Sequence, residues 1–140
     1  MFMYVAWPRL TAEYRYVRIL TGSDADKVFH LMQLWMSNDA AAGPVLTRLL
    51  EDSSDPVTRA AAARYLERYP SEPAIVGLMA AARDRDQQVR TDAIASLGEV
   101  GDARTIALLR GLAAREKTLE ASYAREALKR LAARGVAGER

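Results

Sequence analysis

The sequence contains no cysteine and only one histidine, His30. Without cysteine the chain can form neither a disulfide nor a thiolate metal site, and it has no cysteine nucleophile. His30 lies in an apolar stretch with no recognisable serine motif around it, which indicates a structural histidine. The glycines also lack the spacing of a phosphate-binding loop. We therefore expect a protein that is not an enzyme and that holds no cofactor or metal.

Targeting signals and strong charge are lacking as well. The first twenty residues carry Arg9, Glu13, Arg15 and Arg18 and lack the apolar run of a secretory signal, and no segment approaches the roughly 18 apolar residues of a membrane span. The formal net charge is only +2, which does not argue for nucleic acid. Half of the 140 residues are hydrophobic, so one globular domain is expected. We predict a soluble, cytoplasmic protein without a membrane partner.

The clearest pattern is an internal repeat with a period of 31 residues. Six identities share this period: Asp55 and Asp86, Arg59 and Arg90, Ala62 and Ala93, Leu66 and Leu97, Ile75 and Ile106, and Leu78 and Leu109. Tandem units of this length are typical of solenoids, in which each unit buries its apolar face against its neighbours. A weaker match at a shift of 34 aligns Ala127 and Leu131 with Ala93 and Leu97, which implies three inserted residues.

Each unit is predicted to contain two helices. The first helices cover about 56–69 and 87–100, and the second helices start near 73 and 103. Asp55, Asp86 and Asp102 precede helices and are good N-caps, because a carboxylate can accept hydrogen bonds from the free amides of the first turn. Capping also explains the paired aspartates at 24 and 26, 52 and 55, and 84 and 86 without a metal site. Prolines end the first unit's first helix, and Gly98 and Gly101 are expected to end its equivalent.

The remaining segments complete a single domain, 1–140. Residues 23–53 have the same two-helix spacing, with helices near 23–36 and 44–50, and are interpreted as a degenerate repeat. Full repeats follow at 54–84 and 85–115. Residues 116–140 form a C-terminal capping helix, about 119–134, which ends at Gly135. Residues 1–22 match no repeat and are predicted to be an N-terminal cap segment.

The segment from Asp86 to Gly98, DQQVRTDAIASLG, followed by Gly101-Asp102, resembles the HEAT-like repeat family, particularly the short repeats described from phycobilisome lyases. The resemblance covers about 54–134. The first unit departs from the pattern, because Thr58 replaces a valine and Pro70 stands in the glycine turn. The family implies an all-α, right-handed α-solenoid of about three helix pairs. It also implies that Arg59 and Arg90 link adjacent repeats through the turn aspartates 55 and 86.

The resemblance implies that the second helices line a concave, partner-binding surface, which makes this protein a small adaptor or scaffold. Four arginines near those helices are candidate contacts to a protein with an acidic surface: Arg83, Arg104, Arg110 and Arg115. One alternative is a nucleic-acid-binding protein, although these arginines do not repeat in register. Another is a lyase-type subunit acting on a tetrapyrrole-bearing protein, which only the family resemblance suggests.

Aromatic residues gather at the start of the chain. Five of the ten lie in the first sixteen residues, namely Phe2, Tyr4, Trp7, Tyr14 and Tyr16. The pattern permits a hairpin across residues 8–12 or a helix over 11–20, and we favour the helix. These aromatics either cover the end of the solenoid or form a docking patch for a partner or a second copy. Trp7, Tyr14 and Tyr16 are therefore further candidate contact residues.

Overall fold

The computed structural model describes residues 2–138, with side chains described from residue 11 onward. Within these residues the chain is helical and contains no strand. The helices are α1 (Phe2–Thr21), α2 (Asp24–Met36), α3 (Ala42–Asp52), α4 (Pro56–Tyr65), α5 (Glu72–Ala81), α6 (Gln87–Val100), α7 (Ala103–Ala113) and α8 (Leu119–Ala133), with a short 3₁₀ helix at Leu66–Arg68. None of these helices is long and apolar enough to cross a membrane.

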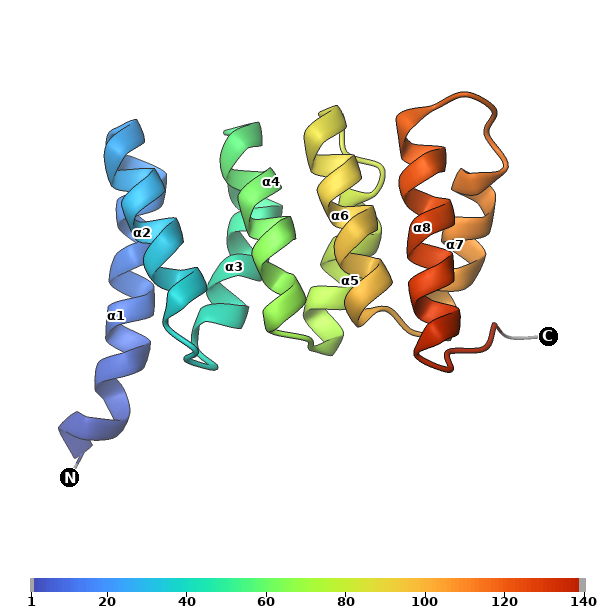
Figure 1. Cartoon of the computed structure of the whole chain (residues 1–140). Coiled ribbons are helices and arrows are strands. Elements are labelled where there is room, and N and C mark those ends of the chain that lie inside the picture. The colour runs from blue at the N-terminus through green and yellow to red at the C-terminus, as the bar shows by residue number, and fades with distance from the viewer. Residues whose placement is uncertain (1, 139–140) are drawn as a thin grey trace.

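The helices stand side by side in two layers (Figure 1). One layer contains α2, α4, α6 and α8, and the other contains α1, α3, α5 and α7. Each helix of the first layer packs against the helix that precedes it in the chain. Helices α4, α6 and α8 also pack against one another more extensively than α3, α5 and α7 do. The prediction of an all-helical repeat stack is therefore confirmed.

The helix starts follow the predicted caps. Asp55 accepts a hydrogen bond from the Val57 amide at 3.1 Å, and Asp86 accepts one from the Val89 amide at 3.1 Å. Helix α6 has the predicted bounds, and α7 begins at the predicted residue, Ala103. Helix α4 is shorter than predicted: it ends at Tyr65 and tightens into the 3₁₀ turn. Proline disfavours the helical conformation in the residue before it, so the backbone leaves the helix ahead of Pro70.

The helix favoured for the start of the chain is confirmed, although it is longer than predicted. The hairpin alternative is wrong, because residues 2–21 form one continuous helix. The helix predicted over 11–20 exists but begins earlier, at Phe2, and runs through Pro8 at the cost of one backbone hydrogen bond. It is the longest helix in the structure, and its first turns extend beyond the end of α2 (Figure 1).

Gly98 does not end a helix, contrary to the prediction, since α6 continues to Val100 and only Gly101 lies at its end. Its role is packing against α8. A Cβ atom on Gly98 would lie 2.9 Å from the Cα of Ala127, which is closer than real Cβ atoms approach backbone. Glycine at this position therefore lets α6 and α8 pack closely. In the sequence, a glycine needed for such packing cannot be distinguished from a glycine that ends a helix.

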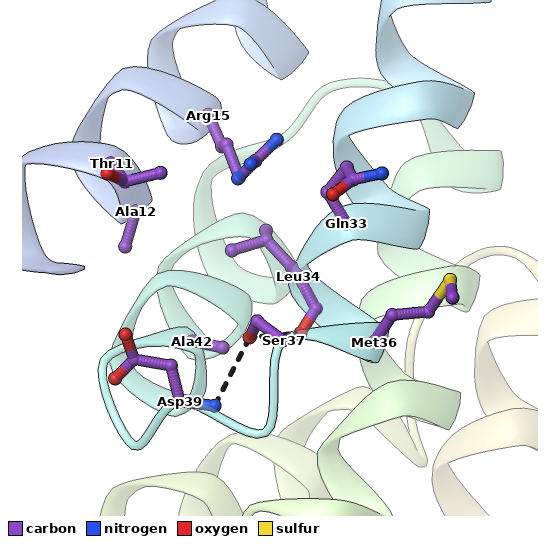
Figure 2. Close-up of a pocket in the computed structure, with 9 residues that line it drawn as sticks. All are labelled: Thr11, Ala12, Arg15, Gln33, Leu34, Met36, Ser37, Asp39 and Ala42. Carbon is purple, nitrogen blue, oxygen red and sulfur yellow. Dashed lines mark hydrogen bonds between the residues drawn. The ribbon is translucent and has the colours of Figure 1, made fainter.

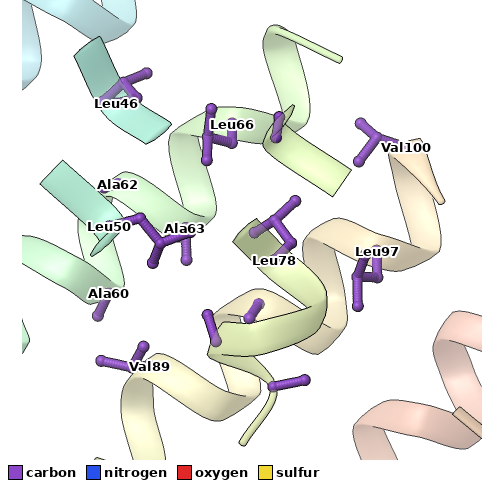
Figure 3. Close-up of a cluster of buried hydrophobic side chains, with 14 of the residues drawn as sticks. Leu46, Leu50, Ala60, Ala62, Ala63, Leu66, Leu78, Val89, Leu97 and Val100 are labelled. Atoms are coloured by element: carbon purple, nitrogen blue, oxygen red, sulfur yellow. The ribbon is translucent and has the colours of Figure 1, made fainter. Parts of the chain in front are cut away.

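The core runs along the whole stack rather than forming one central cluster. Figure 3 shows its middle section, where leucines from α3, α5 and α6 meet the alanine-rich face of α4. Leu66, Leu78 and Leu97 are completely buried. Small residues let α4 and α6 approach closely enough for the Ser96 hydroxyl to donate to the Ala63 carbonyl at 2.7 Å. This close layer fixes the positions of the surfaces described next.

Candidate interaction surfaces

Four large apolar side chains share one exposed side of α2. Val28, Phe29, Met32 and Met36 are between 45% and 58% exposed. Their spacing of three and four residues places them on one side of the helix, while Leu31 and Leu34 on another side are buried. The only other residue on this exposed side, Ala25, is also uncharged. Such a stripe is unusual at the end of a solenoid, where the outer face is normally polar.

Tyr14 of α1 extends this apolar stripe around His30. The His30 ring is buried and lies edge-on to both Tyr14 and Phe29, with ring centroids 5.7 Å and 5.1 Å away. Arg15 donates to its Nδ1 at 3.3 Å, so the imidazole is neutral. Burial, together with the positive charges of Arg15 and Arg18, lowers the pKa of His30. The histidine thus supports the two exposed aromatic rings from within, as a structural residue.

A pocket of about 450 Å³ opens beside the stripe, between α1, α2 and the start of α3 (Figure 2). Leu34, Ala12 and Ala42 form its apolar part, while Arg15 and Asp39 provide charge. The loop below it is held by a hydrogen bond from the Asp39 amide to the Ser37 hydroxyl at 3.3 Å. Met36 lines this pocket and also belongs to the stripe. We call the pocket, Tyr14 and the stripe (Val28, Phe29, Met32 and Met36) the N-terminal surface.

The other aromatic residues near this end have structural contacts. Trp35 stacks on Tyr65 of α4, with ring centroids 5.8 Å apart, and so joins α2 to the next pair. Tyr16 donates to Asp52 at 3.0 Å and lies under the Arg48 guanidinium, 4.0 Å from the ring centroid. Of the predicted contact aromatics, Tyr14 is therefore exposed and Tyr16 is engaged by α3. The side chain of Trp7 lies outside the described residues.

The repeated arginines of α4 and α6 link neighbouring elements. Arg59 forms a bidentate ion pair with Asp84, at 3.0 and 3.1 Å, and donates to the Ser53 carbonyl at 3.0 Å. Arg90 pairs with Glu120 at 2.7 Å. The expected partners, the aspartates 55 and 86, are instead occupied in capping α4 and α6, so that detail of the prediction is wrong. Arg90 connects the repeat at 85–115 to the C-terminal helix, as predicted but through a different carboxylate, whereas Arg59 pairs with Asp84 within the repeat at 54–84.

The four predicted contact arginines fall into two groups. Arg104 is held by Glu72, at 2.6 Å, and by Asp102, at 2.7 Å, which satisfies its charge within the chain. Arg110 is exposed on α7. Arg83 and Arg115, by contrast, come together at a second pocket of about 420 Å³, which also includes Arg90 and Glu120. The sequence analysis predicted both Arg83 and Arg115 as contact residues but did not indicate that they line the same pocket.

A comparison with family models identifies the repeats. The model for HEAT repeats matches residues 43–129, which is more than half of the chain. The chain is a HEAT-repeat protein. None of the curated proteins compared with it matches. The HEAT match covers α3 to α8 and leaves out α1 and α2, so the N-terminal surface lies on elements outside the matched repeats.

The two layers of the stack differ in how closely their helices pack. Helices α4, α6 and α8 form the close layer, and α5 and α7 lie in the layer whose members contact one another less. Gly98 and the alanines of α4 produce this difference, because only small residues permit that approach. That the second helices, α5 and α7, line a concave partner-binding surface stays a prediction.

Proposed function

We propose that this HEAT-repeat protein is a non-catalytic protein-interaction module whose partner docks on the N-terminal surface. The observation that carries the proposal is the uncharged stripe of Val28, Phe29, Met32 and Met36, exposed on α2. An apolar patch of this kind loses its contact with water when a partner covers it, which favours association. Aromatic and methionine side chains are enriched in such interfaces.

The occupant that best fits the surface is an amphipathic helix of another protein. From Val28 to Met36 the stripe is about 12 Å long, which matches two turns of a docked helix. The adjoining pocket of about 450 Å³ can accept one large apolar side chain from that helix. Charges flank the stripe, since Arg18 pairs with Asp26 at 3.1 Å and Lys27 lies 3.5 Å from Asp24. They would form the polar rim of an interface around an apolar centre.

Site-specific photo-crosslinking tests the proposal. A photoreactive amino acid at Met32 should capture a discrete protein in a lysate of the source organism, whereas the same group at Arg110 on α7 should not. Phe29→Asp combined with Met32→Asp should abolish capture by a reactive group placed at Val28. Because both positions are exposed, the substitutions should leave the fold intact, which circular dichroism checks. Equal capture at both positions, or none at Met32, would reject the N-terminal surface as the docking site.

The same preparation separates the other possibilities. A crosslink between two copies, with a doubled mass by light scattering, would identify the occupant as a second copy instead of a different protein. Retention of DNA or RNA at low salt would favour a nucleic-acid-binding protein, because phosphate contacts are strongest there. An absorbance change on titration with a bilin would favour the lyase-type alternative.

A further inference from the structure

The ion pair that Arg59 makes in the first full repeat is not reproduced by Arg90 in the second. The acid that holds Arg59 is Asp84, and a shift of 31 residues places Arg115 at the corresponding position. Arg90, the counterpart of Arg59, consequently takes its partner from the first turn of α8, where Glu120 accepts at 2.7 Å. In the second repeat, the position that would hold the pairing carboxylate is therefore occupied by an arginine, Arg115.

Arg115 and Arg83 are therefore left with free guanidinium groups. Both side chains are exposed, and neither has a hydrogen bond or an ion pair with any residue whose side chain the structure describes. Asp84, a carboxylate of the same pocket, is already engaged. Both oxygens of Asp84 accept from Arg59, and one also accepts from the Asp86 amide at 2.9 Å.

The two free arginines stand at one pocket of about 420 Å³, at the edge of the stack where the turns after α5 and α7 lie together (Figure 1). Its lining combines three arginines, two carboxylates, two apolar residues and one hydroxyl: Arg83, Arg90 and Arg115, Asp84 and Glu120, Ala82 and Leu112, and Thr118. The lining thus has an excess of positive charge. Arg59, behind Asp84, adds to it.

We propose that this pocket binds an oxyanion carried on a peptide segment of the partner protein, a proposal that rests on the interaction function above. A guanidinium group pairs with a carboxylate or a phosphate through two parallel hydrogen bonds, and two such groups at one pocket can hold one oxyanion between them. Leu112 and Ala82 provide an apolar wall for the methylene stem of a glutamate side chain. One side of the pocket is rigid, because Arg90 donates a hydrogen bond to the Asp84 carbonyl at 2.9 Å.

Fluorescence polarisation with short labelled peptides tests the pocket. The probes are a glutamate-rich peptide, the same peptide with glutamine at every glutamate, and a version with phosphoserine in their place. At low ionic strength the wild type should bind the acidic probes and not the glutamine peptide, and salt should weaken this binding. The tighter acidic probe identifies the source of the oxyanion as carboxylate or phosphate.

Paired variants assign the binding to the pocket. Arg83→Gln with Arg115→Gln should weaken binding at least about tenfold, whereas Arg110→Gln with Arg125→Gln makes the same charge change on exposed residues outside the pocket and should change it less than about twofold. Equal losses in both pairs, or equal binding of the glutamine peptide, would overturn the proposal. So would tighter binding of an oligonucleotide than of either acidic peptide. The variants at Phe29 and Met32 should leave peptide binding unchanged, so failure of the pocket and failure of the N-terminal surface are distinguishable.

Discussion

Arg59 and Asp84 form a bidentate ion pair that is nearly closed to solvent, with side chains only 6% and 16% exposed. Arg59 belongs to α4 and Asp84 to the turn between α5 and α6, so the pair fixes α4 to that turn. Three of the donor groups of Arg59 are used, two by Asp84 and one by the Ser53 carbonyl. Removing one member leaves a buried charge without compensation.

Replacing Arg59 with methionine should destabilise the protein by about 3 to 5 kcal/mol, because Asp84 would then be charged and unpaired. Combining Arg59→Met with Asp84→Asn should restore part of this loss. Arg104→Ala is the matched control, since its ion pairs are exposed to solvent and should contribute much less to stability. Urea unfolding followed by circular dichroism measures all three. If Arg59→Met lowers the free energy of unfolding no more than Arg104→Ala does, the Arg59–Asp84 ion pair does not stabilise the fold as proposed.

Acid should weaken the same pair. Burial opposes ionisation of Asp84, but hydrogen bonds from Arg59 and from the Asp86 amide outweigh it, so the pKa of Asp84 lies below its ordinary value of 3.8. The unfolded chain therefore binds the proton more readily, and the contribution of Asp84 to stability is complete above about pH 4 and is lost as the pH falls further. Melting temperatures across this range should fall more steeply for the wild type than for the Arg59→Met, Asp84→Asn variant. Parallel curves would exclude this linkage.

His30 should produce a separate decline at milder pH. Its pKa is lowered in the folded state by burial and by Arg15 and Arg18, relative to 6.5 in the unfolded chain. Its stabilising contribution is therefore present above about pH 6.5 and is lost as the pH falls towards the lower, folded pKa. Since His30 is the only histidine, His30→Gln should flatten the melting temperature between about pH 7 and pH 5. The prediction concerns the slope of the melting temperature against pH in the two proteins, and not their absolute stabilities.

Two glycines in helices should respond in opposite directions to alanine. Gly98→Ala should destabilise by about 1 to 3 kcal/mol, because its Cβ would press on the backbone at Ala127 and force α6 and α8 apart. Gly111→Ala in α7 should stabilise by about 0.5 to 1 kcal/mol, since its Cβ would have no atom within 4 Å and alanine is the better helix former. Thermal unfolding of the two variants gives the comparison. Effects of equal sign would show that helix propensity alone governs both sites.

The sequence predicted what depends on local chemistry and on the repeat. Capping aspartates placed the starts of α4, α6 and α7, and the period of 31 residues identified the repeated helices. It could not predict the role of Gly98, because a glycine that ends a helix and a glycine that admits a neighbouring helix look alike in sequence. Nor could it show that Arg83 and Arg115 meet, since that depends on where two separate turns lie in space.

The exposed side of α2 could not be predicted from its sequence alone. Val28, Leu31 and Leu34 follow one another at helical spacing, yet Leu31 and Leu34 are buried while Val28 is exposed. Phe29, Met32 and Met36 share the exposed side with Val28. A helix at the end of a stack has neighbouring helices on fewer sides. Apolar residues on the sides without a neighbour therefore stay exposed to solvent. The number of neighbours is a property of the assembled fold and not of the helix sequence.

The close layer also determines where the protein can open. Helix α6 lies between α4 and α8 and packs on α5 as well, whereas α1 contacts only α2 and α3 extensively. In a stack whose units touch only their neighbours, amide hydrogen exchange reports the cost of separating each unit. Amides of α6 should thus exchange most slowly and those of α1 most rapidly. The amides of α1 and α2 can then exchange with solvent while the rest of the stack stays closed, which makes the end that carries the apolar stripe the most adaptable part of the described chain.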